Sequence, residues 1–282
     1  MRPDVIAAIR AGRADYQWSE IVRRHGGHEA RFRIFRDALK VGGVRVTVRP
    51  TEAQQAADLL GAVLPTPLLL DALYEQADIH IPPKTGPHDH SMDDWDVCIR
   101  HSARVDAAIA GRVGTVCPVG KHWVAHYLMT ESRAVLYGWP VPAAEVHHAG
   151  GRAVWEGIGL YTAECGSGHV IQQPSAAHTH RHRDYSMTLV LVDDTCLVDG
   201  QPMGVAGVAR DPDLCGLVLA SGRPLWSLRL PGVEKVPPLC ERASRPSWGE
   251  EGPKTEPAPP PEFDGHDASH VERDKPEGWR RG

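Results

Sequence analysis

The sequence has no apolar run that approaches the roughly 20 residues needed to span a bilayer, and no apolar segment near its N-terminus that resembles a signal peptide. It also lacks a basic excess, because its formal net charge is -5 and its isoelectric point is about 6.3. Nucleic-acid-binding proteins usually carry a positive balance. We therefore expect a soluble chain made in the cytosol, with no membrane span and no nucleic-acid partner.

A paired-cysteine motif is missing as well. The six cysteines are scattered and none forms a C-x-x-C pair, which argues against a zinc ribbon. Such scatter is typical of free, buried thiols in a reducing compartment. Cys98 and Cys117 are the best placed to act as a nucleophile with a distant histidine base, so a cysteine peptidase stays as one alternative.

The order of patterns along the chain predicts an α+β fold, with N-terminal helices and a hairpin followed by a mainly antiparallel sheet. Residues 1–50 are predicted to form a helix and hairpin segment, with the turn signal Gly42-Gly43 between alternating runs. Residues 51–232 are predicted to form the α+β domain that carries the site. Residues 233–282 are rich in proline and charge, so we predict a disordered tail there.

Histidine is concentrated in one part of the chain. Of the 16 histidines, 12 lie between His80 and His182. Histidines that only face solvent would be spread along the whole sequence. We therefore expect this segment to hold the functional site.

The stretch from His178 to Ser186 carries the strongest functional pattern. Side chains of an extended strand alternate between faces with period two, so His178, His180, His182, Asp184 and Ser186 would share one face. Burying three imidazoles, a carboxylate and a hydroxyl without partners costs stability. The row favours a metal or proton-transfer site, and a solvated loop is the alternative.

A His-x-His pair on a strand is a common way to hold zinc or iron. The first and third imidazoles of the row would lie about 13 Å apart on an ideal strand that rises roughly 3.3 Å per residue. One ion therefore cannot bind all three without a bend. The candidate ligands are His178, His180 and His182, either as a His-x-His pair or as His178 with His182 across a turn, with His122 added from another strand. Zinc is the candidate cofactor.

Three further residues have candidate catalytic roles beside these histidines. Asp184 is expected to orient an imidazole. Ser186 is a candidate nucleophile, although it lacks the G-x-S-x-G elbow of serine hydrolases. Lys121 is a candidate to stabilise an anionic intermediate.

Aromatic residues beside turns suggest a substrate groove. Tyr137 and Trp139 flank a glycine, and Tyr185 follows Asp184 directly. Rings of this kind often line peptide and glycan sites, so these three are the candidate substrate-binding residues. Packing of the same rings in the core is the alternative.

Several short elements together resemble a poorly characterised group of bacterial and phage-encoded proteins. They lie within roughly residues 55–220, and they are Leu64-Pro-Thr, Gly120-Lys121, Tyr137-Gly-Trp139, His178-x-x-x-His182-x-Asp184-Tyr-Ser186 and Val198-Asp-Gly. The resemblance implies a shared architecture and a shared site, and it supplies no mechanism. As site residues, the resemblance favours the following over His180: Lys121, Tyr137, His178, His182, Asp184 and Ser186. Trp123 and the H-x-H at 88–90 depart from the pattern.

Three functions remain in view. The favoured one is a hydrolase of a polymer, with cell-wall peptidoglycan or its peptides as substrate, in which the His/Asp cluster activates water directly or through a metal. The second is a non-catalytic binding or structural module, such as a virion component. The third is the cysteine peptidase described above. No pattern indicates an oligomeric state, so none is predicted.

Overall fold

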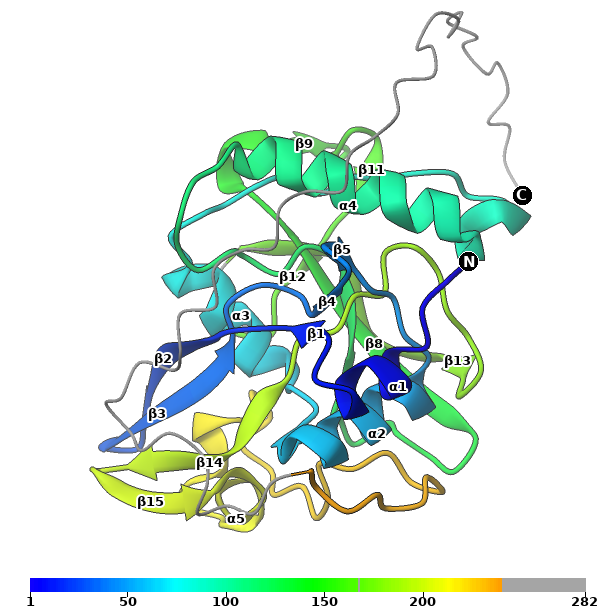
Figure 1. Cartoon of the computed structure of the whole chain (residues 1–282). Coiled ribbons are helices and arrows are strands. Elements are labelled where there is room, and N and C mark those ends of the chain that lie inside the picture. Colours follow the sequence, from blue (N-terminus) through cyan, green and yellow to red (C-terminus); the bar gives the residue numbers. More distant parts are fainter. Residues whose placement is uncertain (167, 240–282) are drawn as a thin grey trace, which may run out of the picture.

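The structure is a computed structural model that describes residues 1–166 and 168–239. These residues form an α+β fold, which confirms the predicted class (Figure 1). The predicted disordered tail starts at residue 233, and from residue 240 onward it lies outside the described residues. No helix in the described ranges is long and apolar enough to cross a membrane.

The helices begin and end at residues that suit those positions. Thr66 caps one helix, because its hydroxyl oxygen accepts a hydrogen bond from the Leu69 amide at 3.3 Å, and Pro67 takes the first helical position. The described α-helices are α1 (Val5–Arg10), α2 (Pro50–Leu60), α3 (Pro67–Gln76), α4 (Trp95–Ile109) and α5 (Val205–Arg210), with single 3-10 turns at His90–Asp93, Ala143–Glu145 and Cys215–Leu217.

The pairings between the strands are antiparallel, and two sheets contain most of the paired residues. The first has the order β15 (Gln201–Gly204), β14 (Val192–Val198), β3 (His28–Phe35), β2 (Trp18–His25), and β6 (Ala62–Val63) also pairs with β14. The second has the order β12 (Tyr161–Thr162), β13 (His169–Thr179), β8 (Arg133–Val141), β7 (Lys121–Val124). Two small sheets are β1 (Ala14–Asp15), β4 (Lys40–Val41), β5 (Val44–Arg45) and β11 (Ile158–Gly159), β10 (Arg152–Trp155), β9 (His147–Ala149).

A large hydrophobic core joins the N-terminal segment to the rest of the chain. The hairpin of β2 and β3 pairs with β14, so residues from 1–50 and from 51–232 share one sheet. One cluster of buried side chains extends from Val5 to Leu230. Removing this apolar surface from water is the main force that stabilises the fold.

A second, smaller cluster lies under the segment that follows β13. Val97 and Cys98 of α4 pack there against Trp139 of β8 and against Tyr185. The cluster fixes the backbone on either side of Tyr185, which includes Asp184 and Ser186. Packing of apolar residues therefore holds the polar residues of the predicted site in place.

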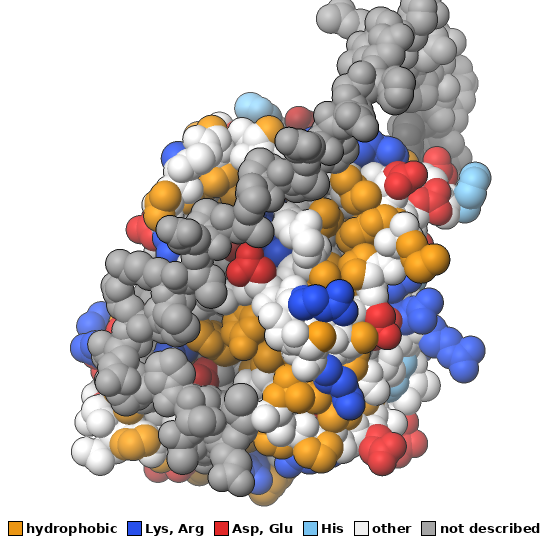
Figure 2. All heavy atoms as spheres, viewed as in Figure 1, with side chains coloured by type: hydrophobic (Ala, Val, Ile, Leu, Met, Phe, Trp, Pro, Cys, Tyr) orange, Lys and Arg blue, Asp and Glu red, His pale blue; other side chains and the backbone are white. Residues whose placement is uncertain are grey.

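The visible face of the molecule carries charges of both signs. In Figure 2, the blue Lys and Arg side chains and the red Asp and Glu side chains are interspersed with apolar ones. This mixture agrees with the modest net charge of the sequence.

Candidate functional site

Strand β7 sends successive side chains to opposite faces of the second sheet. On one face, Lys121 Nζ lies 3.1 Å from Asp184 Oδ2, and the Trp123 ring meets the His178 ring edge to face with 6.3 Å between centroids. His122 points to the other face and is buried, with its Nδ1 3.0 Å from the Thr188 carbonyl oxygen. His122 therefore lies on the opposite face from Lys121 and His178, which corrects its prediction as a metal ligand beside His178.

The segment after β13 is a turn and not a continuous strand. Strand β13 ends at Thr179, and the His182 amide donates to the Thr179 carbonyl oxygen at 3.2 Å. The turn brings the His182 ring onto the His178 ring, with 3.9 Å between centroids and 5° between planes. The prediction of a single extended row is therefore wrong beyond Thr179. His178 and His182 do lie next to each other across the turn, but as stacked rings.

Lys121, His178, His182, Asp184 and Ser186 form one cluster, and Asp184 is at its centre. It is 3% exposed, and its Oδ1 accepts hydrogen bonds from the Ser186 amide at 2.7 Å and from the Ser186 hydroxyl. Its Oδ2 faces Lys121 Nζ at 3.1 Å and His182 Nε2 at 4.0 Å. A buried carboxylate requires such partners. Through Asp184 and the stacked rings, the structure brings together all the residues predicted as catalytic.

The two stacked imidazoles are neutral at neutral pH. Burial lowers the pKa of His178 to about 4, and the charges of His182 and Lys121 act in the same direction. Burial also lowers the pKa of His182, although the Asp184 carboxylate acts in the opposite direction. A neutral imidazole accepts a proton, so the cluster holds two candidate bases.

The predicted zinc site does not fit this geometry. Because the His178 and His182 rings stack face to face, their ring nitrogens lie in parallel planes and do not converge on one point. His180 turns away, with its Nε2 3.2 Å from the Thr130 carbonyl oxygen. Among the described residues, no three His, Cys, Asp or Glu side chains form a group that could hold a metal ion. We therefore assign no step to a metal.

Ser186 is a positioning residue in this arrangement. Its side chain is fully buried and its hydroxyl donates to Asp184 Oδ1. A nucleophilic serine would instead donate to a base and face the substrate. Ser186 thus fixes the orientation of the Asp184 carboxylate and leaves Oδ2 for Lys121.

The three predicted substrate-binding aromatics belong to the core. Tyr137, Trp139 and Tyr185 are at most 4% exposed. Tyr137 and Trp139 lie on β8, which is central in its sheet and buried along nearly its whole length. The Tyr185 hydroxyl accepts a hydrogen bond from the Gly86 amide at 2.6 Å. Trp139 and Tyr185 pack together beneath the site, whereas Tyr137 faces Asp71 of α3. Contrary to the prediction, none of the three rings lines an open groove.

Arg183, which precedes Asp184 in the chain, lines an open depression whose other lining residues do not belong to the cluster. Its volume is about 510 Å³, and charged groups of both signs line it, including Arg2, Asp4, Glu52 and Arg183. Arg183 Nε is 2.8 Å from Asp93 Oδ1. Sequence reasoning missed this depression because its walls come from α1, α2 and the turn after β13, which meet only in the folded chain.

Sequence reasoning also missed Asp71. This carboxylate on α3 is buried, accepts a hydrogen bond from the Tyr137 hydroxyl at 2.7 Å and another from the Cys165 amide at 2.9 Å. Burial raises the pKa of Asp71 to about 6. The Leu/Asp/Ala pattern of this helix is the one available signal, because it places an acidic residue among core-facing leucines.

The buried thiols do not resemble the nucleophile of a peptidase. Burial raises the pKa of Cys117 to about 11 and also raises the pKa of Cys98. Cys117 Sγ donates to the Ile81 carbonyl oxygen, and Cys98 Sγ contacts Thr47 and Arg2. Within the described residues, neither thiol is hydrogen-bonded to a histidine. A reactive thiolate requires the opposite environment.

Buried neutral histidines make stability depend on pH. Burial lowers the pKa of His101 and of His122 to about 4, so the unfolded chain binds more protons than the folded one between that value and about 6.5. Each ring should therefore remove about 2 kcal/mol of unfolding free energy between pH 7 and pH 5. The raised pKa of Asp71 acts in the opposite direction and offsets about 1 kcal/mol.

We expect urea denaturation to give a clearly lower unfolding free energy at pH 5 than at pH 7. The variant His101→Phe should lose about 2 kcal/mol of this difference, because it removes a buried ring whose Nε2 has no partner. The matched control His88→Gln, at an exposed loop position, should keep the full difference. If His101→Phe and the parent chain lost the same unfolding free energy between pH 7 and pH 5, the contribution assigned to His101 would be contradicted.

Comparison of the chain with protein-family models, with curated proteins and with solved structures found no match. The function is therefore argued from the geometry of the site.

Proposed function

We propose that the chain is a hydrolase whose reaction centre is the Asp184 cluster. The observation that carries the proposal is the contact of one buried carboxylate with an ammonium group, beside two neutral and partly exposed imidazoles. Such a set provides a base, a group that stabilises the protonated base, and a cation for developing negative charge. Titratable groups with shifted pKa values, such as His178 and His182, cluster at functional sites.

The roles follow from the positions of the side chains. His182 takes a proton from water as the water oxygen attacks the scissile carbonyl, and Asp184 stabilises the imidazolium that forms. The 4.0 Å between His182 Nε2 and Asp184 Oδ2 is longer than a hydrogen bond. In the reaction, either the two groups move closer as charge develops on His182, or a water molecule bridges them. Lys121 stabilises the oxyanion. His182 then returns the proton to the leaving amine as the carbon–nitrogen bond breaks.

The cluster fits amide cleavage better than glycoside cleavage. Most glycosidases use two carboxyl groups roughly 5 to 9.5 Å apart, one of which must carry a proton. Asp184 is the one carboxylate in the cluster. The neighbouring Asp93 is paired with Arg2 and Arg183, which lowers its pKa and keeps it ionised.

The surroundings support an extended and charged substrate. The depression next to Arg183 is open and carries both cationic and anionic side chains. A polymer with free carboxylate and amino groups complements such a surface. The stem peptides of cell-wall peptidoglycan have this chemistry, so peptidoglycan is the proposed polymer.

The test is incubation of purified peptidoglycan with the full chain, with and without a metal chelator, followed by mass spectrometry of the soluble products. We expect peptide fragments whose masses correspond to amide hydrolysis, in equal yield with the chelator. Adsorption to the wall without soluble fragments would instead favour a binding module. Loss of fragments on chelation would contradict a reaction carried out by His182, Asp184 and Lys121 without a metal.

A further inference from the structure

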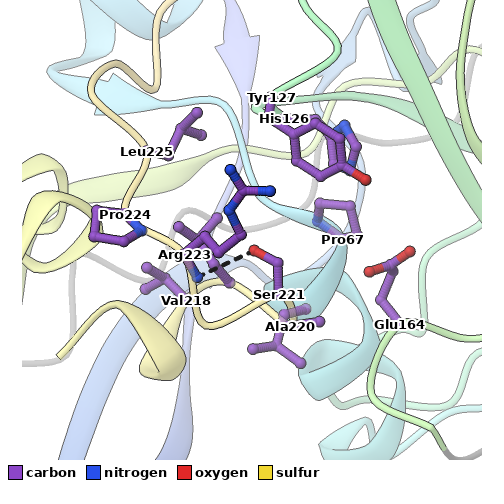
Figure 3. A pocket seen from close by; sticks show the side chains of 12 residues that line it. Pro67, His126, Tyr127, Glu164, Val218, Ala220, Ser221, Arg223, Pro224 and Leu225 are labelled. Carbon is purple, nitrogen blue, oxygen red and sulfur yellow. Dashed lines mark hydrogen bonds between the residues drawn. The ribbon is translucent and has the colours of Figure 1, made fainter. Parts of the chain in front are cut away.

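A second pocket lies on the α3 side of the second sheet, away from Asp184. Its volume is about 120 Å³. Its walls combine the start of α3, the segment after β7, the loop before β13 and the segment after the last 3-10 turn (Figure 3). Tyr137, which faces this side, is hydrogen-bonded to Asp71 of α3 and to the Glu164 amide. Lys121, on the other face, contacts Asp184.

One part of the pocket wall is apolar. Pro67, Leu68, Val218 and Leu225 line it. Leu68 and Val218 belong to the buried core, so this part of the wall is rigid. The volume is small compared with the roughly 300 to 1,000 Å³ of sites for drug-sized molecules. A ligand with a short aliphatic group is the size and chemistry that such walls accept.

Arg223, Glu164 and His126 are among the polar residues that line the same pocket. In Figure 3, the Arg223 guanidinium and the Glu164 carboxylate approach the pocket from different sides. Within the described residues, neither side chain forms a salt bridge. Both charges are therefore available to a ligand, one for an anionic group and the other for a cationic group.

His126 supplies a third polar group at the same pocket. Its Nδ1 accepts a hydrogen bond from the Leu128 amide at 3.2 Å, which places the ring proton on Nε2. Burial lowers its pKa to about 4, so the ring is neutral at neutral pH. The Tyr127 ring packs against it, with 4.0 Å between ring centroids and 33° between ring planes. The Nε2–H group is a neutral donor on a residue that lines the same pocket as Arg223 and Glu164.

We propose that this pocket binds a free aliphatic α-amino acid. Arg223 and the His126 Nε2–H group hold the carboxylate, Glu164 holds the ammonium group, and the apolar wall takes the side chain. This proposal is independent of the reaction assigned to Asp184, because the two sites lie on opposite faces of one sheet.

The test is calorimetric titration of the full chain with L-leucine, L-leucinamide and 4-methylpentanoate. The amide lacks the carboxylate and the acid lacks the ammonium group. We expect each analogue to bind about tenfold more weakly than leucine, since each loses one charge-assisted interaction. Absence of leucine binding, or equal affinity for all three compounds, would overturn the proposal.

Variants at exposed positions separate the two charges without threatening the fold. Arg223→Gln should weaken leucine binding about tenfold and reduce the preference for leucine over leucinamide, since only His126 then holds the carboxylate. Glu164→Gln should remove the preference over 4-methylpentanoate. Arg152→Gln is the matched control, because Arg152 is exposed at the start of β10. Asp184→Asn should bind leucine with unchanged affinity. A failure of the leucine-binding proposal is therefore distinguishable from a failure of the proposed hydrolase. Leucine binding that both pocket variants leave intact would refute the assignment.

Discussion

Replacement of Asp184 by asparagine is expected to lower the rate of peptidoglycan cleavage by about a thousandfold, within the range that general acid–base groups contribute. Asparagine has nearly the same shape and can still accept a hydrogen bond from Ser186. It has no charge with which to stabilise the imidazolium of His182 or to hold the Lys121 ammonium group. The measurement is the initial rate of fragment release at saturating wall concentration.

The matched control for this change is Asp15→Asn. Asp15 lies on β1, is exposed, and forms no ion pair with another described side chain. It should retain the parental rate. Circular dichroism and the urea midpoint establish that Asp184→Asn is folded. A folded Asp184→Asn chain that cleaves at the parental rate would show that the cluster has a structural role alone.

Replacement of Gly120 by alanine is expected to cause a large loss of unfolding free energy. A Cβ atom at this position would lie 2.2 Å from the Ser186 carbonyl oxygen and 3.0 Å from Thr188 Oγ1. Real Cβ contacts are not that short, so the backbone of residues 186–188 must move. The movement would break the hydrogen bond from the Lys121 amide to the Ser186 carbonyl oxygen, which is 2.8 Å long.

We expect Gly120→Ala to lose about 2 to 4 kcal/mol of unfolding free energy, from overpacking together with one lost backbone hydrogen bond. Cleavage activity should fall as well, since Lys121 would no longer be held against Asp184. Gly159→Ala is the matched control, because a Cβ there meets nothing within 4 Å. Equal urea midpoints for the two variants would contradict the proposed role of this contact.

The sequence contained the members of the cluster but not its geometry. The period-two pattern places His178, His182 and Asp184 on one face of a strand, with the two imidazoles about 13 Å apart. In the structure a turn brings the two rings together and places His182 beside Asp184. The pattern failed at His180, because the chain turns after Thr179 and redirects that ring towards Thr130. A turn without glycine or proline leaves little signal in a single sequence.

Burial was the other property that sequence reasoning could not supply. Aromatic rings beside turns have the same local pattern whether they line a groove or fill a core, and Tyr137 and Trp139 do the latter. The pairing of Asp71 with Tyr137 joins residues 66 positions apart. Such contacts depend on how a helix packs on a sheet, which neither periodicity nor motif spacing specifies.

The most direct test of the central claim is digestion of purified peptidoglycan in water enriched in the heavy oxygen isotope, with the parental chain and Asp184→Asn side by side. Mass spectrometry should show one heavy oxygen in each new carboxylate for the parental chain, because the attacking water supplies it. Asp184→Asn should give almost no labelled product. Soluble fragments without label, or no fragments from a folded parental chain, would contradict a hydrolase centred on Asp184.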